Sequence, residues 1–244
     1  MPRDWIKLDR NTKSLPNSTI FRSLLGSLMY LAVQTRPDIA FATSRIACYA
    51  HEPLEQDLEA LMHICFYLKS TIDVGLTFKK GNAHDISVIG FSDSDFAEER
   101  TTRKSTTGSI WTLNGTPISW NSKRQDIVTT SSTEAELVAL DFALKEGIWI
   151  KKLLLEIGLV KDEPIKLMTD NQSTIKIVKG SKITQRTKHI DVKYMFAREL
   201  YQSNRLNVEY IASNENPADA FTKPLSYEGI FKLQTIMQGM NIQS

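Results

Sequence analysis

The 244-residue chain has few cysteines, almost no net charge and no long apolar run. Its two cysteines, Cys48 and Cys65, lie in apolar segments with a helical pattern, which favours buried free thiols over a disulfide framework or a zinc site. The longest apolar stretch, Leu24–Val33, is far shorter than the ~20 residues of a membrane span. Met1–Arg10 mixes charged with apolar side chains, unlike a secretory signal. We therefore expect a soluble intracellular protein, cytoplasmic or nuclear, that is not secreted and has no membrane partner.

The formal net charge of +2 decides little, since a protein that binds nucleic acid needs basic residues only on the face that meets the phosphates. Hydrophobic residues make up 41% of the chain and charged residues 24%, as in ordinary globular proteins. The length allows one large domain, or one domain with a smaller module attached. There is no internal repeat and no low-complexity tract.

The first ~80 residues have the apolar spacing of helices. The expected elements are helices around Leu24–Leu31, from Pro37, and from after Pro53 to about Lys69, a short strand at Val74–Phe78, and a linker at Gly81–Ala83. Pro37 suits the first position of a helix, because its missing N–H would be unpaired there anyway.

From Ile86 onward the pattern changes to strands mixed with helices. Strands are expected at Ile86–Ser92, Ser109–Leu113, Ile118–Asn121, Pro164–Thr169 and Leu206–Ile211, and helices at Ser132–Ile157, Gln172–Lys179, Thr187–Ser203, from Pro217, and weakly at Tyr227–Met240. Asn114-Gly115 is typical of a two-residue hairpin turn. Three antiparallel strands followed by strand–helix alternation predict an α/β fold, with a five-stranded mixed sheet flanked by helices.

Four acidic residues stand at the ends of these elements. Asp93 ends the first strand, Glu136 lies near the start of the long helix, Asp170 ends the fourth strand, and Asp219 follows Pro217. Strand C-terminal ends and helix N-terminal ends share one edge of such a sheet, so the four carboxylates can converge. Their mutual repulsion calls for cations, and hard oxygen ligands favour Mg²⁺ or Mn²⁺. Two such ions can stabilise both the attacking and the leaving oxygen of a phosphodiester displacement.

Each acid alone also has a structural explanation. Thr133 and Glu136 match a capping box. Asp170 fits an N-cap or turn, Asp219 fits a helix dipole, and Asp93 fits a strand-end turn. Only the predicted placement of all four acids at one edge of the sheet favours a metal site over these structural explanations.

Two neighbours could be mistaken for the ligands. Asp95 follows Asp93 by two residues on the same side of the strand, but further out. Glu134 precedes Glu136 and points about 200° away around the helix.

Seven linked segments have matching order and spacing in one known family: Gly90–Ala97, Arg103–Gly108, Pro117–Lys123, Ser131–Glu136, Asp170–Ser173, Arg186–Asp191 and Ala218–Leu225. With these, the chain resembles the ribonuclease H domain of copia-type (Pseudoviridae) LTR retrotransposon Pol polyproteins. Residues 1–80 resemble the end of the reverse transcriptase in the same polyproteins, through Tyr30–Val33, Thr35–Ala40 and Tyr67–Thr71.

The resemblance implies a division of the chain and a fold. Residues 1–80 would be a mainly helical thumb and connection remnant, 84–226 a domain with the ribonuclease H-like fold, and 227–244 a C-terminal tail. The compartment implied is the cytoplasm, in virus-like particles, or the nucleus.

The resemblance also implies an activity. The chain would be an endonuclease that cuts the RNA strand of RNA–DNA hybrids with two Mg²⁺ ions, for which Mn²⁺ can substitute, and without a small-molecule cofactor. Asp93 would bridge both ions, Asp219 would help hold the ion that activates water, and Glu136 and Asp170 would hold the ion at the leaving 3′ oxygen. The products would carry 5′-phosphate and 3′-hydroxyl ends.

Six further residues would contact the nucleic acid: Ser131, Ser132, Asn171, Arg186, Lys188 and His189. Besides the hybrid, the implied partners are the missing part of the reverse transcriptase, or a second copy of the chain bound through the N-terminal helices. For His189, a role in local structure remains open.

The chain departs from the wider family in two ways. The loop Ala212–Asn216 lacks the histidine that cellular ribonucleases H often carry, so we expect slower product release. The Tyr-x-Asp-Asp motif of a polymerase palm is absent, which excludes DNA synthesis by this chain alone. The alternative is a catalytically silent nucleic-acid-binding module from a truncated or domesticated element. An integrase-type nuclease fits the seven segments poorly.

Overall fold

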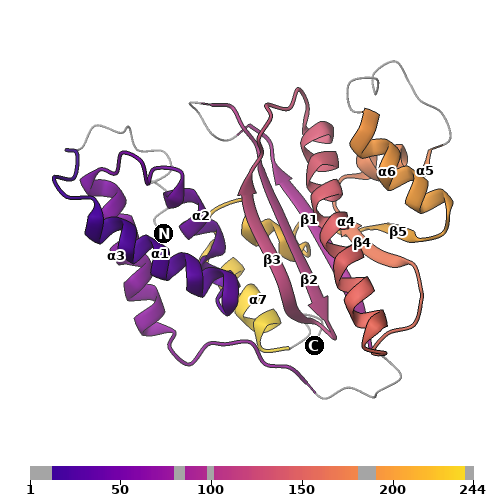
Figure 1. The fold of residues 1–244 in the computed structure, drawn as a ribbon, viewed down its shortest axis with the longest axis horizontal. Coiled ribbons are helices and arrows are strands. Elements are labelled where there is room, and N and C mark those ends of the chain that lie inside the picture. Colours follow the sequence, from indigo (N-terminus) through magenta and orange to yellow (C-terminus); the bar gives the residue numbers. More distant parts are fainter. Residues whose placement is uncertain (1–12, 80–85, 98–101, 181–190, 240–244) are drawn as a thin grey trace.

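A mixed β-sheet with helices on both faces forms the centre of the protein (Figure 1). The computed structural model describes residues 13–79, 86–97, 102–180 and 191–239. The predicted linker at Gly81–Ala83 lies outside these ranges. None of the helices within them is both long and apolar enough to cross a membrane.

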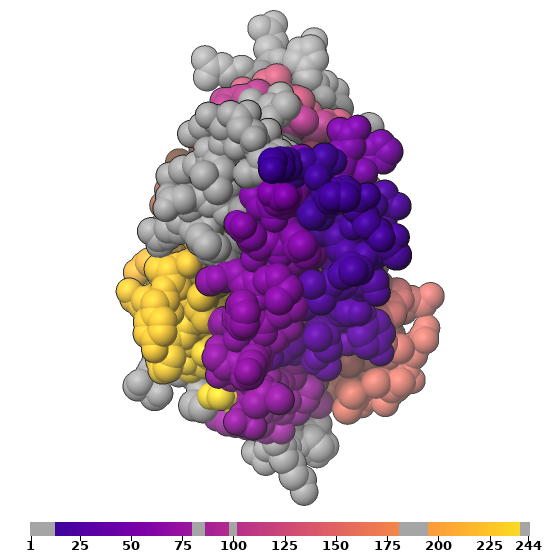
Figure 2. Space-filling model, turned by 90° about the vertical axis from the view of Figure 1, so that its left-hand side faces the viewer, coloured from indigo at the N-terminus to yellow at the C-terminus, as the bar shows by residue number. Residues whose placement is uncertain are grey.

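The N-terminal part is helical, as predicted. It contains α1 (Thr19–Gln34), the 3₁₀ helix η2 (Pro37–Ile39), α2 (Ala40–Ala47) and α3 (Glu55–Ser70). The buried side chains of α1 recur every three or four residues, at Phe21, Leu25, Leu28 and Ala32, so one stripe of the helix faces the core. Figure 2 shows the outer surface of these helices, with the C-terminal helix α7 beside them.

The predicted strand at Val74–Phe78 is wrong. This segment has no regular secondary structure and joins no sheet. Its polar backbone is satisfied elsewhere: the N–H of Thr77 donates to the Met237 carbonyl at 2.9 Å, and the Thr116 hydroxyl donates to the Thr77 carbonyl at 2.8 Å. The segment therefore pairs with the end of a helix and with one side chain instead of a neighbouring strand.

The sheet has five strands in the order β3-β2-β1-β4-β5. The strands are β1 (Val88–Asp95), β2 (Thr106–Leu113), β3 (Thr116–Arg124), β4 (Ile165–Thr169) and β5 (Leu206–Tyr210). The pairs β1–β2 and β2–β3 are antiparallel, whereas β1–β4 and β4–β5 are parallel. This arrangement confirms the predicted α/β fold with the strand pattern of ribonuclease H-like proteins.

The β2–β3 hairpin turns at Asn114-Gly115, as predicted. Both residues have positive φ, 49° and 85°, which a two-residue type I′ turn requires. Asparagine and glycine are the residues that adopt this backbone at least cost.

One face of the sheet is covered by α4 (Ser132–Glu156), α5 (Gln172–Lys179) and α6 (Asp191–Gln202). Trp111 of β2 fills the space between sheet and α4, and its indole N–H donates to the Ala143 carbonyl at 3.1 Å. A Cβ on Gly90 or Gly147 would lie 2.5 or 2.2 Å from this indole. These two glycines thus allow the helix to approach the sheet around a buried tryptophan. The first four residues of the predicted helix Thr187–Ser203 lie outside the described ranges.

The other face carries the 3₁₀ helix η4 (Pro217–Phe221), α7 (Tyr227–Met237) and the N-terminal helices. One hydrophobic core joins α1, α2 and α3 to Ile110 of β2, Phe221 of η4 and Leu233 of α7. Two hydrogen bonds also join the N-terminal helices to β3: the indole N–H of Trp120 donates to the Ala32 carbonyl at 2.6 Å, and the Ser44 hydroxyl donates to the Ser122 carbonyl at 2.7 Å. The division at residues 80 and 226 stays a prediction.

Candidate metal centre

The first carboxylate of the centre comes from β1. Asp93 lies near the C-terminal end of this strand, opposite Gly108 of β2. A Cβ on Gly108 would lie 2.6 Å from the Ala218 carbonyl and 2.7 Å from the methyl group of Thr222. The glycine therefore allows η4 to approach the sheet closely, and this approach brings the Thr222 hydroxyl into a hydrogen bond with the Asp93 carboxylate.

The second carboxylate comes from α4. Ser131 caps this helix by accepting a hydrogen bond from the Glu134 N–H at 3.1 Å, and the Glu134 carboxylate in turn accepts from the Thr130 N–H. Because the helix is capped by Ser131 and not by Thr133, the capping explanation of Glu136 is wrong. Glu136 lies two residues after Glu134 along the helix and accepts a hydrogen bond from the Ser94 N–H of β1 at 3.1 Å.

The third carboxylate follows β4, the parallel neighbour of β1. Asp170 accepts a hydrogen bond from the Ser213 hydroxyl. It is not the N-cap of α5, because Asn171 fills that position and accepts from the Thr174 N–H at 2.9 Å. The N-cap explanation of Asp170 is therefore wrong as well.

These three carboxylates converge, whereas the fourth lies slightly apart. One oxygen each of Asp93, Glu136 and Asp170 lies within 4.8 Å of the others. Asp219, in the first turn of η4, lines the same cavity of about 340 Å³ but forms an ion pair with Lys223. The sheet edge thus gathers all four predicted acids in one cavity, three of them at the spacing of a metal site.

Burial makes this cluster electrostatically costly when no cation is bound. Burial, reinforced by Asp93 and Asp170, raises the pKa of Glu136 to about 8. Burial also raises the pKa of Asp93 to about 6; the Thr222 hydrogen bond opposes this shift, and Asp170 and Asp219 add to it. A cation in the cavity would relieve the repulsion that these shifts report.

One buried oxygen has no partner among the described residues. Oε2 of Glu136 is shielded from solvent and accepts no hydrogen bond there, although its other oxygen does. An unpaired buried carboxylate oxygen beside two further carboxylates fits a hard divalent cation such as Mg²⁺ or Mn²⁺. The donor set is therefore compatible with the predicted metal.

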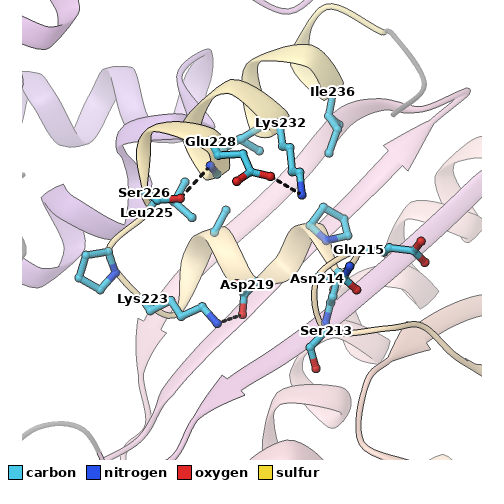
Figure 3. A pocket seen from close by; sticks show the side chains of 16 residues that line it. Ser213, Asn214, Glu215, Asp219, Lys223, Leu225, Ser226, Glu228, Lys232 and Ile236 are labelled. Carbon is cyan, nitrogen blue, oxygen red and sulfur yellow. Dashed lines mark hydrogen bonds and ion pairs between the residues drawn. The ribbon is translucent and has the colours of Figure 1, made fainter. Parts of the chain in front are cut away.

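Lys223 lines the acidic cavity together with Asp219. Burial alone would lower the pKa of its ammonium group, but the bond to Asp219 and the charges of Asp93 and Asp170 raise it. A second cavity, of about 540 Å³, adjoins the first between η4 and α7 and shares Ser213, Asp219 and Lys223 with it (Figure 3).

Three partners of the acids were not predicted from the sequence: Thr222, Ser213 and Lys223. Thr222 and Lys223 lie within the segment Ala218–Leu225, but nothing local marks a threonine as the partner of a distant aspartate. Lys223 follows Asp219 by four residues, a spacing that brings side chains together on a helix and could have indicated the pair.

The predicted nucleic-acid contacts are only partly described. Ser131 and Ser132 are exposed at the start of α4, and Asn171 lines the acidic cavity. Arg186, Lys188 and His189 lie outside the described residues.

Two relatives bear on the family. Over 203 residues, 83% of its length, the chain is 42% identical to the retrovirus-related Pol polyprotein from transposon TNT 1-94 of Nicotiana tabacum. Over 225 residues, 92% of its length, it is 39% identical to the corresponding polyprotein from transposon RE1 of Arabidopsis thaliana. The chain is homologous to one segment of copia-type retrotransposon Pol polyproteins. It spans 15% of the length of each of these two Pol polyproteins.

The homology to Pol polyproteins confirms the resemblance inferred from the seven segments. No protein-family model matches the chain. Among solved structures, LC11-RNase H1 in complex with RNA/DNA hybrid aligns with 60% of this chain and 98% of its own, at 18% identity and a TM-score of 0.42.

Proposed function

We propose that this chain is a metal-dependent endonuclease that cuts the RNA strand of RNA–DNA hybrids. The observation that carries the proposal is the convergence of Asp93, Glu136 and Asp170, with ligand atoms within 4.8 Å of one another and one buried oxygen that has no partner among the described residues. These residues come from two strand ends and one helix start, so the fold, and not local sequence, creates the cluster. Homology to Pol polyproteins supports hybrids as the substrate class.

Asp93, Glu136 and Asp170 would hold one divalent ion, and Asp219 together with Asp93 would hold a second. When bound, such ions polarise a phosphoryl oxygen and lower the pKa of an attacking water. Thr222 and the Ser94 N–H already orient the Asp93 and Glu136 carboxylates, as outer partners of metal ligands commonly do.

The substrate would lie across the edge that carries these acids. Ser131 and Ser132 at the exposed start of α4, and Asn171 at the start of α5, are the proposed backbone contacts. Arg186, Lys188 and His189 are proposed as further contacts from the sequence. The 2′-hydroxyl groups and the duplex shape would distinguish the RNA strand from DNA.

A cleavage assay tests the proposal with two variants of the acids and one control, Glu134→Gln, from the same helix as Glu136. Glu136→Gln and Asp93→Asn should each lower the rate on a labelled hybrid with Mg²⁺ by on the order of a hundredfold or more, because loss of a mere outer partner already lowers metal affinity or activity 10–100-fold. Glu134→Gln, two residues from Glu136, should keep its cap and near wild-type activity.

Two results would contradict the proposal. Hybrid binding without cleavage under Mg²⁺ or Mn²⁺ would identify the chain as a silent binding module. Equal cutting of duplex DNA would refute the assignment of the RNA strand as substrate.

A further inference from the structure

The four acids of the candidate centre differ in how their charge is balanced. Asp93, Glu136 and Asp170 face one another, and the described residues place no cationic side chain in an ion pair with any of the three. Asp219 lines the same cavity, but its carboxylate is paired with the Lys223 ammonium (Figure 3). Within the described residues, Lys223 thus forms a direct ion pair with the fourth acid and acts on Asp93 and Asp170 only through its charge at longer range.

Lys223 is well placed to leave Asp219. Its side chain is 51% exposed, although that of Asp219 is only 26% exposed, and an ion pair whose cation reaches solvent contributes little net stability. Lys223 also lines the larger cavity between η4 and α7 (Figure 3). The flexible four-carbon stem of lysine allows such a movement without a backbone change.

The backbone around this lysine is held independently of the ion pair. The Thr222 hydroxyl donates to the Asp93 carboxylate, and the Thr222 N–H donates to the Asp219 carbonyl at 3.3 Å. Release of Lys223 would therefore leave Asp93 and the turn that carries Asp219 in place.

We propose that Lys223 is a displaceable counter-cation: the Asp93–Glu136–Asp170 cluster binds the first divalent ion, and the second binds only when Lys223 releases Asp219. This inference rests on the proposed function, because it assumes that the four acids bind cations. It predicts unequal sites, one preformed and one in competition with a lysine of the chain itself.

A second lysine–carboxylate ion pair, in the larger cavity between η4 and α7, provides a matched control. Lys232 and Glu228 lie four residues apart in α7 at 3.3 Å, line the larger cavity, and do not line the acidic one (Figure 3). Lys232→Ala therefore removes an equivalent surface lysine without touching any of the four acids.

Calorimetric titration of the metal-free 244-residue chain with Mn²⁺ tests the inference. In the wild type, a stronger and a weaker binding step are expected. Lys223→Ala should tighten the weaker step by about fivefold, the factor that corresponds to the loss of one competing surface ion pair. The stronger step should change by less than about twofold, and Lys232→Ala should change neither.

Further variants separate competition from a structural effect. Lys223→Arg keeps a cation opposite Asp219 and should retain the wild-type affinities. Asp219→Asn should lose the weaker step, and adding Lys223→Ala to it should restore nothing. Lys223→Gln provides the same test if Lys223→Ala proves unstable, with circular dichroism to confirm folding.

An unchanged or weaker second step in Lys223→Ala and Lys223→Gln would overturn the inference. Failure of the proposed function gives a different result: ions bind in two steps, but no hybrid is cut. If Mn²⁺ does not bind at all, both are wrong.

Discussion

The hydroxyl of Thr222 donates a hydrogen bond to the carboxylate of Asp93, although 129 positions separate the two residues in the chain. This contact joins the end of η4 to the central strand of the sheet and holds a buried acid. Replacement of Thr222 is therefore informative about both stability and metal affinity.

Thr222→Val keeps the shape of the side chain and removes the donor. We expect the free energy of unfolding to fall by about 1.5–3 kcal/mol, because a buried charged acceptor loses its partner. Mn²⁺ affinity should fall about tenfold or more, as is usual when an outer partner of a metal ligand is lost. Urea denaturation and calorimetry measure the two effects. Thr222→Ser should behave like the wild type. If Thr222→Val had the same free energy of unfolding and the same Mn²⁺ affinity as the wild type, the role of this hydroxyl would be refuted.

The metal-free protein should lose stability as the pH rises. The pKa of Asp93, about 6, and that of Glu136, about 8, exceed their ordinary values of 3.8 and 4.5, so the folded state binds these protons more tightly than the unfolded chain. The stabilisation is fully present below about pH 4 and is lost as the pH rises through about 6 and then 8. The total effect should be on the order of a few kcal/mol.

Urea denaturation in EDTA at pH 5.5, 7.0 and 8.5 measures this dependence. Glu136→Gln should flatten the plot of stability against pH between about pH 7 and 8.5. In the wild-type protein, saturating Mg²⁺ should restore the stability that is lost at pH 8.5, because the ion binds the folded state. A stability that rises between pH 5.5 and 8.5 without metal would contradict the burial of these two acids.

Gly147→Ala should destabilise the protein. Its Cβ would lie 2.2 Å from the Trp111 indole, which is itself enclosed, so the free energy of unfolding should fall by about 1–3 kcal/mol or more. Gly26→Ala in α1 is the control, since nothing lies within 4 Å of a Cβ there, and it should stabilise by up to ~1 kcal/mol. Urea denaturation compares the two, and similar effects would refute the packing argument.

A chain that begins at residue 84 should be less stable than the full chain. Ile110 and Phe221 are fully buried in the core that the N-terminal helices complete, and exposing both would cost about 3 kcal/mol or more. Thermal unfolding followed by circular dichroism should show a lower midpoint, and binding of an apolar dye should increase. Unchanged, cooperative unfolding would instead identify residues 84–244 as an independent domain.

Local patterns were sufficient to predict much of the fold. The Asn114-Gly115 turn and α5 depend on neighbouring residues and were predicted correctly, and the topology rule placed all four acids at one edge. Val74–Phe78 was mistaken for a strand because its partners, Met237 and Thr116, lie far along the chain. No periodic pattern carries that information.

The same limit applies within the site. The sequence offers a capping box from Thr133 to Glu136, and only the three-dimensional structure shows that the N-cap is instead Ser131, whose hydroxyl accepts from the Glu134 N–H. The Thr222 contact depends on the close approach of η4 over Gly108, which is a property of two distant segments together.

The covering of β3 by the N-terminal helices has a consequence for solubility. As an outer strand of the sheet, β3 could recruit a strand from another molecule, a common route to aggregation. Here the backbone carbonyl of Ser122 in this strand accepts a hydrogen bond from Ser44 of α2, and the indole of Trp120 donates to Ala32 of α1. Removal of these helices would therefore do more than shorten the protein, because it would expose the Ser122 carbonyl of an outer strand to other molecules.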